Sequence, residues 1–181
     1  GHLDMLMAHI LYSDKPFMGS VTSTENARDS VELVRRLYGS EAILENPALL
    51  SLVNVNSPRQ FDETMIGALR VYAENRQAVV ITPFIMSGTM APVTIAGALT
   101  QQNAEALAGI VYAQMVNPGT PVVYGSYLTT VDMRSGAPVF GSPESQIALF
   151  ASAQISRFYN LPFRSGGMYT CLLYTSDAAD E

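Results

Sequence analysis

The sequence predicts an α/β fold with a parallel sheet, and three observations support this prediction. Short β-branched runs alternate with stretches that carry alanine, leucine and charged residues at helical spacing. Expected strand starts near residues 50, 78, 121 and 161 give intervals of about 28 to 43 residues, which suit βα units. Long segments rich in Gly, Ser and Met follow strands, whereas connections from helix to strand are mostly short. This asymmetry favours a partial (β/α)8 TIM-type barrel of about five βα units over a doubly wound sheet.

The N-terminal half is expected to contain three strands and two helices. Gly39 would end the first helix, and the third strand is apolar enough to be covered on both faces, as parallel strands are. The expected elements are strands at residues 16–21, 50–55 and 78–84, and helices at residues 24–38 and 60–75.

The C-terminal half is expected to contain two further strands with long loops after the third and fourth strands. Pro143 and Glu144 suit the first turn of the last helix, since proline needs no helical hydrogen bond there and an acid favours the positive end of the helix dipole. The expected elements are loops at residues 85–94 and 128–142, helices at 95–116 and 143–159, and strands at 121–127 and 161–167. Five units are too few to close a barrel.

Composition excludes several classes of protein. The chain has 181 residues, 48% of them hydrophobic, and a formal net charge of −6, which argues against nucleic-acid binding. No apolar run reaches the roughly 18 to 20 residues of a membrane span and no leader pattern opens the chain, so we expect a cytoplasmic protein that does not bind a membrane. Cys171 is the single cysteine, and His2 and His9 lack companions at metal-ligand spacing, so no metal site is predicted.

Two short motifs admit a functional and a structural interpretation. Arg164-Ser-Gly-Gly follows a strand and could hold an anion with its backbone NH groups, although a plain turn is the more frequent meaning of such a run. Ser87-Gly88 resembles the surroundings of a nucleophilic serine, but no histidine partner is available for a triad. Nucleotide-binding glycine patterns are absent from the sequence.

Aromatic and charged residues at the strand ends are the candidate binding residues. Aromatic faces attract ammonium groups by about 0.5 to 2 kcal/mol per contact, and an acid could balance the bound cation. Core packing is the alternative for each ring, and a turn or a helix start is the alternative for each acid. The candidate substrate-binding residues are Phe84, Tyr124, Tyr127, Asp132, Phe140, Glu144 and Arg164, and no catalytic residue is assigned.

Several long segments of the sequence, taken in order, resemble the trimethylamine methyltransferase family. The resemblance runs from about His2 to Gly167 and so covers nearly the whole chain. The residues that carry it are Tyr12-Ser-Asp-Lys-Pro-Phe-Met-Gly-Ser-Val-Thr, Ser51-Leu-Val-Asn-Val-Asn-Ser-Pro, Ser87-Gly-Thr-Met-Ala-Pro-Val-Thr-Ile-Ala-Gly-Ala-Leu-Thr-Gln, Ala104-Glu-Ala-Leu-Ala-Gly-Ile, Pro121-Val-Val-Tyr-Gly-Ser, Ser135-Gly-Ala-Pro, Phe140-Gly-Ser-Pro-Glu and Pro162-Phe-Arg-Ser-Gly-Gly.

The resemblance implies a (β/α)8 barrel that transfers a methyl group from a methylated amine to the Co(I) of a separate corrinoid protein. The corrinoid would be supplied by that partner, with no cofactor bound directly to this chain. Trimethylamine members use a pyrrolysine in a C-terminal portion, whereas relatives without it act on quaternary amines such as glycine betaine. The substrate therefore stays open between these amines. The resemblance also implies one-carbon metabolism or methanogenesis, and a homo-oligomer at full length.

The end of the chain departs from the family pattern. Residues 171–181, CLLYTSDAADE, resemble a translated sequencing adapter, so we interpret residues 1–170 as a fragment of one methyltransferase barrel domain. Two alternatives remain at this stage. The fragment could be an incomplete and inactive barrel, or the barrel could belong to a lyase such as a decarboxylase or aldolase, for which Arg164 is the available basic residue at a strand end.

Overall fold

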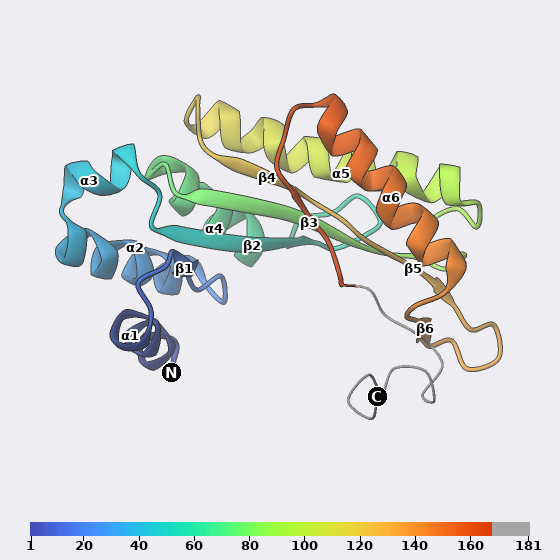
Figure 1. The fold of residues 1–181 in the computed structure, drawn as a ribbon, viewed down its shortest axis with the longest axis horizontal. Coiled ribbons are helices and arrows are strands. Elements are labelled where there is room, and N and C mark those ends of the chain that lie inside the picture. The colour runs from blue at the N-terminus through green and yellow to red at the C-terminus, as the bar shows by residue number, and fades with distance from the viewer. Residues whose placement is uncertain (168–181) are drawn as a thin grey trace, which may run out of the picture.

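The computed structural model describes residues 1–167 and shows a parallel sheet with helices packed against it (Figure 1). The predicted tail at residues 171–181 lies outside the described residues. The helices are α1 (His2–Tyr12), α2 (Thr24–Tyr38), α3 (Ser40–Glu45), α4 (Glu63–Glu74), α5 (Ile95–Val116) and α6 (Pro143–Phe158). The strands are β1 (Phe17–Met18), β2 (Leu49–Val55), β3 (Ala78–Ser87), β4 (Val122–Gly125), β5 (Tyr127–Val131), β6 (Pro138–Val139) and β7 (Phe163–Arg164).

Five parallel strands form the main sheet in the order β1-β2-β3-β4-β7. β5 follows β4 in the chain and, like β4, pairs with β3 in parallel. β5 also pairs with β6, which runs antiparallel to it. Within residues 1–167 the sheet is open, which agrees with the predicted partial barrel. Parallel neighbours joined through helices place all strand C-terminal ends on one edge, where barrel proteins carry their sites.

Side chains alternate between the two faces of the sheet along each strand. One face is covered by helices, and we call the other the inner face. In β2 the residues at alternate positions from Leu49 to Val55 are buried, whereas Asn54 between them is exposed. The buried set forms the main core with Val79, Ile81 and apolar residues of α2, α4 and α5. The inner face is the opposite face, and the parallel register assigns to it Leu50, Leu52, Asn54, Val80, Thr82, Phe84, Val123, Gly125, Tyr127 and Arg164.

The helix ends follow their capping residues. The predicted helix at residues 95–116 is confirmed, and the Thr94 hydroxyl accepts a hydrogen bond from the backbone NH of Gly97 at its start. Gly39 ends α2 with a φ of 94°, as predicted for a helix that stops at glycine. α4 begins at Glu63, later than predicted, because the Asp62 carboxylate caps the NH of Met65. No helix in the described range combines the length and apolar character needed to cross a bilayer.

Two predicted loops are partly strand, and two helices were not predicted. β3 extends to Ser87, inside the predicted loop at residues 85–94. The predicted loop at residues 128–142 contains all of β5 except Tyr127 and all of β6, and the two strands form a hairpin. Gly136, with a φ of 72°, adopts the left-handed conformation in the turn of that hairpin. This glycine, which had suggested a long loop, therefore lies in the turn between two strands. The unpredicted helices are α1 and α3.

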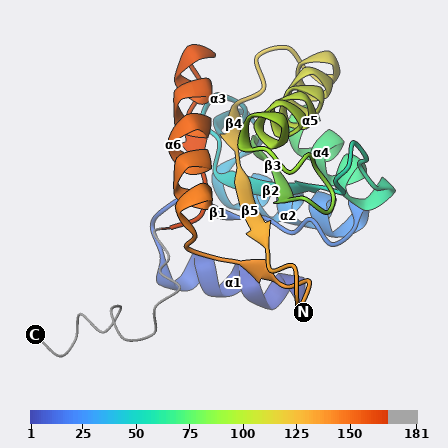
Figure 2. The same ribbon diagram turned by 90° about the vertical axis from the view of Figure 1, so that its right-hand side faces the viewer.

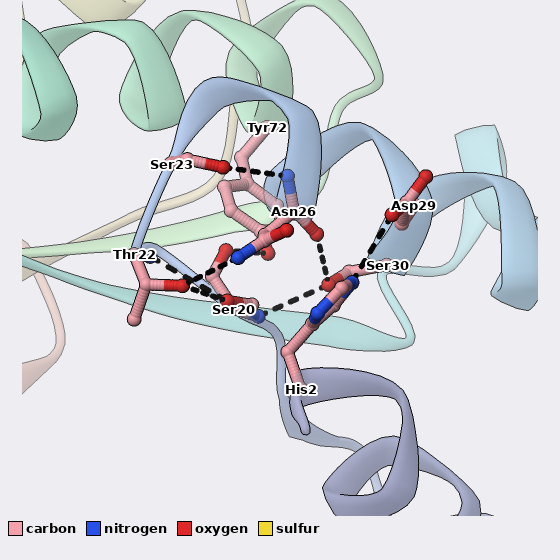
Figure 3. Close-up of polar contacts among 8 residues, drawn as sticks. All are labelled: His2, Ser20, Thr22, Ser23, Asn26, Asp29, Ser30 and Tyr72. Carbon is pink, nitrogen blue, oxygen red and sulfur yellow. Dashed lines mark hydrogen bonds and ion pairs between the residues drawn. The ribbon is translucent and has the colours of Figure 1, made fainter.

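Hydrogen bonds hold the segment that follows β1 against α2 and α4 (Figure 3). The Tyr72 hydroxyl donates to the carbonyl oxygen of Ser20 at 2.7 Å. The NH of Ser20 donates to the Ser30 hydroxyl at 3.1 Å, and that hydroxyl donates to the carbonyl of Asn26 at 2.8 Å. Each of these polar groups therefore has a protein partner, and the contacts fix the segment that follows the C-terminal end of β1.

Candidate functional site

Three of the four predicted aromatic residues lie together at the C-terminal edge of the sheet. Phe84 and Tyr127 are register partners on β3 and β5, and their rings stack with centroids 5.3 Å apart and planes at 28°. Phe140, between β6 and α6, meets the Tyr127 ring edge-on, with centroids 5.9 Å apart and planes at 71°. We call Phe84, Tyr127 and Phe140 the ring cluster. The Phe140 side chain is 42% exposed, so the cluster is open to solvent on that side.

A hollow adjoins the ring cluster between β5, α6 and the segment after β7. It encloses about 320 Å³ of empty space, the solvent at its mouth included. Figure 2 shows the end of β5 beside α6. Ser145 and Gln146 of α6 form one wall of the hollow. Tyr127 and Phe140 line the hollow together with small and polar residues, among them Ser145, Gln146, Ser165 and Gly166.

Tyr124 does not join the ring cluster. It is fully buried on the helix-covered face, where its ring packs near those of Tyr159 and Phe163 at centroid distances of 6.3 and 6.5 Å. Its hydroxyl donates to the side-chain oxygen of Asn103 in α5 at 3.1 Å. Burial raises the pKa of the Tyr124 phenol to about 12. The expected position of Tyr124 at the barrel mouth is therefore corrected to the core.

The two predicted acids lie on the rim but in different settings. The Asp132 carboxylate accepts hydrogen bonds from the backbone NH groups of Arg134 and Ser135, at 2.7 and 3.3 Å, in the hairpin between β5 and β6. These bonds hold the pKa of the Asp132 carboxyl below its usual value. Glu144 is exposed in the first turn of α6. Within the described residues, neither acid forms an ion pair with a basic side chain.

Arg164 lies on the inner face at the last residue of β7. Its register partner is Gly125, and its side chain is exposed. Next to it, the Ser165 hydroxyl donates to the carbonyl of Ser126 at 2.7 Å, which ties the segment after β7 to the junction of β4 and β5. This tie positions Ser165 and Gly166 at the hollow.

Polar residues behind the sheet fix the junction between β4 and β5. The Ser126 hydroxyl donates to the side-chain oxygen of Gln102 at 2.8 Å and lies 3.0 Å from the Ser152 hydroxyl, while the Gln102 amide donates to Ser152 at 3.2 Å. All three residues are buried. The network joins α5 and α6 to Ser126, the residue between β4 and β5 that precedes Tyr127, so it orients the ring cluster from behind.

Sequence reasoning missed two polar residues of the inner face, Asn54 and Thr82. They are register partners on β2 and β3, and Gly125 of β4 packs closely against Thr82. The signal for Asn54 was its place in an alternating strand, since Leu50, Leu52 and Asn54 must share one face. Among the residues that the structure describes, no group of three or more His, Cys, Asp and Glu side chains is placed to hold a metal ion.

This chain forms an open, parallel part of a barrel, with a hollow at the strand ends that aromatic residues line. Comparisons with known proteins place the chain in a family. The family model "Trimethylamine methyltransferase (MTTB)" matches residues 1–180. The chain belongs to this family, as the resemblance in its sequence implied.

Three curated relatives show which kinds of protein the chain is similar to. It is 52% identical over 167 residues to a glycine betaine methyltransferase of Desulfitobacterium hafniense, covering 92% of the chain and 35% of the relative. It is 34% identical over 174 residues to a proline betaine:corrinoid methyltransferase of Eubacterium limosum, covering 91% and 35%. It is 34% identical over 160 residues to a trimethylamine methyltransferase of Methanosarcina thermophila, covering 87% and 33%. The chain thus spans about a third of the length of these relatives.

Proposed function

We propose that this chain forms part of the barrel of a methyltransferase, which moves a methyl group from a methylated amine to the Co(I) of a separate corrinoid protein. The relatives support this reaction class, because their names specify glycine betaine, proline betaine and trimethylamine as methyl donors and one names a corrinoid acceptor. The ring cluster is the structural observation that carries the proposal. Phe84, Tyr127 and Phe140 present aromatic faces and edges at the strand ends, and Tyr127 and Phe140 line a hollow there.

The ring cluster suits a methylated ammonium group for an electrostatic reason. The faces of aromatic rings carry partial negative charge and attract cations without the strong hydrogen bonds that an N-methyl group cannot form. Apolar rings also exclude water from the methyl carbon, which leaves it accessible to a nucleophile. The Tyr127 ring is held in place by its stacking on Phe84 and by the network behind Ser126, so the site is organised before the ligand arrives.

The chemistry limits what these residues can contribute. The partner's Co(I), when bound, would supply the nucleophile for the methyl carbon. A quaternary or N-protonated amine then leaves as a neutral amine with the electron pair of the broken N–CH3 bond. Because the nitrogen loses its positive charge as that bond breaks, cation–π attraction is strongest before the reaction and weakens in the transition state. The ring cluster therefore acts in capture and orientation of the amine. The step generates no new positive charge on the substrate, so no carboxylate is needed to balance such a charge.

The cellular setting forms part of the proposal. A Co(I) acceptor is strongly reducing and needs a reducing compartment, so we place the protein in the cytoplasm. A homo-oligomer at full length and a corrinoid protein as its partner belong to the same proposal.

The reaction can be tested with the protein that carries this chain. It would be incubated anaerobically with reduced free cobalamin and, in separate reactions, glycine betaine, proline betaine and trimethylamine. We expect enzyme-dependent appearance of the demethylated amine from at least one donor, measured by mass spectrometry, with an equal loss of Co(I) absorbance. Turnover of none of the three donors, with the reduced cobalamin intact, would refute the proposed function.

A further inference from the structure

We propose that the outer face of α5 and α6 is the surface at which this protein pairs with a second copy of itself. The inference rests on the homo-oligomer of the proposed function and names the surface that forms it. Five large apolar side chains on these two helices are between 53% and 84% exposed. We call them the outer patch: Val111 and Met115 of α5, and Ile147, Phe150 and Phe158 of α6.

The outer patch belongs to one stripe of exposed residues on each helix. Within each stripe the residues recur at intervals of three or four, which places them on one side of the helix. The buried residues Gln102 of α5 and Ser152 of α6 lie on the opposite sides, toward the sheet. The α5 stripe is Ala104, Ala108, Val111 and Met115, and the α6 stripe is Ile147, Phe150, Gln154 and Phe158.

The two stripes lie on neighbouring helices. The Asn103 amide of α5 donates to the hydroxyl of Tyr159, the residue that ends α6, at 2.9 Å. The Tyr159 ring in turn meets the Phe158 ring edge-on, with centroids 5.4 Å apart. Figure 1 shows both helices on the same side of the sheet. The stripes therefore lie next to each other on the outside of the helix layer.

The outer face of α5 and α6 carries few charges, unlike the other helices of the same layer. α5 has one charged residue, Glu105, and its side chain is buried. α6 has an acid in its first turn and a base in its last turn, so its formal charge is zero. The core of a protein interface is depleted of charged residues in the same way. In contrast, α2 and α4 expose Arg28, Asp29, Arg36, Arg70 and Glu74.

The size and charge of the outer patch suit a pair of identical chains. Because a fully exposed aromatic side chain offers about 150 to 250 Å², the five side chains together expose on the order of 600 Å². This is at the upper end of the apolar patches that monomeric proteins leave exposed, about 300 to 600 Å². With the smaller residues between them, it approaches the roughly 800 Å² that each partner buries in a standard interface. A two-fold interface brings a surface against its own copy, so a surface without net charge avoids repulsion.

The position of α5 separates this surface from the rest of a barrel. α5 packs between α4 and α6 in the helix layer, whereas the edge strands of the main sheet are β1 and β7. Further strands of a barrel join at those edges, and their helices lie beside the outermost helices rather than over α5. Pairing through the helix side also leaves the inner face and the ring cluster open to the amine and to the corrinoid partner.

The test measures the mass in solution of the protein that carries this chain, by analytical ultracentrifugation. One double variant, Met115→Glu with Phe150→Glu, places an acid on each helix. A second, Met115→Lys with Phe150→Lys, places bases at the same positions. Leu37→Glu is the matched control, because Leu37 is an exposed apolar residue near the end of α2, outside the outer patch.

We expect wild type and Leu37→Glu to have the mass of a dimer or of a multiple of a dimer. Each double variant should fall to half that mass or less, because like charges brought together across an interface repel, and the dissociation constant of the pair should rise at least about 100-fold. Mixing the acidic and the basic variant should restore the wild-type mass at low salt, since opposite charges then meet. Damage to the fold of either variant cannot produce that recovery.

Three results would overturn the inference: a monomeric wild type, double variants that keep the wild-type mass, and no recovery on mixing. A monomeric wild type whose melting temperature falls in both double variants would show that another part of the same polypeptide covers the outer patch. Phe158→Ser, at the most exposed position of the patch, covers the case in which the charged variants do not fold. It should raise the dissociation constant about 10-fold.

Failure of the proposed function would look different. A protein that pairs through the outer patch but demethylates none of the three donors would contradict the methyl transfer and retain the interface. A monomeric protein that demethylates one of them would retain the methyl transfer and overturn the interface.

Discussion

Gly125 on β4 packs so closely against Thr82 on β3 that no side chain fits between them. A Cβ atom at position 125 would lie 2.8 Å from the Thr82 Cα and would overlap the Thr82 hydroxyl and the carbonyl oxygen of Ile81. Two parallel strands meet at this point, directly below the ring cluster and beside Arg164. The close approach therefore fixes the spacing of β3 and β4 just before the strand ends that carry the ring cluster.

Gly125→Ala should destabilise the protein, because the strand backbone would have to move to admit a methyl group. We expect a loss of about 1 to 3 kcal/mol in the free energy of unfolding, measured by urea denaturation. Gly167→Ala is the control, since a Cβ at that position would meet nothing within 4 Å. A Gly125→Ala protein as stable as the control would show that the strands are not in close contact here.

A buried carboxylate on α5 supports the loop that follows β2. Glu105 is 3% exposed and accepts hydrogen bonds from the Ser57 hydroxyl at 2.5 Å, the Arg59 NH at 2.7 Å and the Gln101 amide at 2.9 Å. Glu105→Ala leaves these donors without their acceptor, so we expect a loss of about 2 to 3 kcal/mol in unfolding free energy.

Glu105→Gln should cost less than Glu105→Ala, because the amide oxygen can still accept one or two of those bonds. Glu63→Ala, at an exposed position in α4, serves as the control and should cause a smaller loss than either. Denaturation curves in urea would rank the three variants, and equal losses for Glu105→Ala and Glu63→Ala would contradict the support role.

Local signals predicted most of the fold. The limits of α5 could be read from Thr94 at its start and the Asn117-Pro118-Gly119 turn at its end, because capping and helix-breaking are properties of a few adjacent residues. The hairpin of β5 and β6 was missed for the same reason. Its Gly, Ser and Pro content is typical of a loop, and only pairing with β3 makes β5 a strand.

The candidate site was predictable only in part. Phe84, Tyr127 and Phe140 were expected at the rim and do lie together. Tyr124 was placed with them, yet it is three residues before Tyr127, and an odd spacing along a strand points two side chains to opposite faces. The pairing of Asn54 with Thr82 could not be predicted, because it depends on the register between strands that are distant in sequence.

The stability of the protein should fall in strongly alkaline solution, partly through Tyr72. Burial raises the pKa of the Tyr72 phenol to about 12, above its ordinary value of 10.0. The folded state therefore holds the proton that the unfolded state has lost, and stability falls as pH rises from about 10 to about 12. Tyr72→Phe should cost about 1 kcal/mol near neutral pH, because the bond to the Ser20 carbonyl is lost.

The difference between wild type and Tyr72→Phe should shrink as the pH passes through that window, since phenylalanine does not ionise. Urea denaturation of both proteins at about pH 8 and about pH 11 would measure it. A constant difference at the two pH values would contradict a raised pKa at Tyr72.

Tyr127 and Tyr124 should differ sharply in their effect on turnover. Tyr127→Leu removes a ring that attracts the ammonium group before the reaction, so we expect KM for the amine to rise about 10-fold and kcat to change less than about threefold. Tyr124→Phe keeps the core ring and removes only the bond to Asn103, so both constants should stay near wild type. Steady-state kinetics with the best donor would decide, and a larger KM effect for Tyr124→Phe would place the amine elsewhere.

Asp132 should contribute little to amine binding, although an acid on the rim is a natural candidate to balance a cation. Its carboxylate is engaged by the backbone NH groups of Arg134 and Ser135, and those bonds lower its pKa. An asparagine oxygen can accept the same bonds, so Asp132→Asn should keep the hairpin and leave amine affinity within about twofold by calorimetry.

Asp132→Ala, in contrast, should loosen the hairpin, because the turn loses its acceptor. The aspartate's contribution to the hairpin is present above its unfolded pKa and is lost as pH falls through the lower folded value. A large loss of amine affinity in Asp132→Asn, with the hairpin intact, would instead assign the cation's counter-charge to this carboxylate.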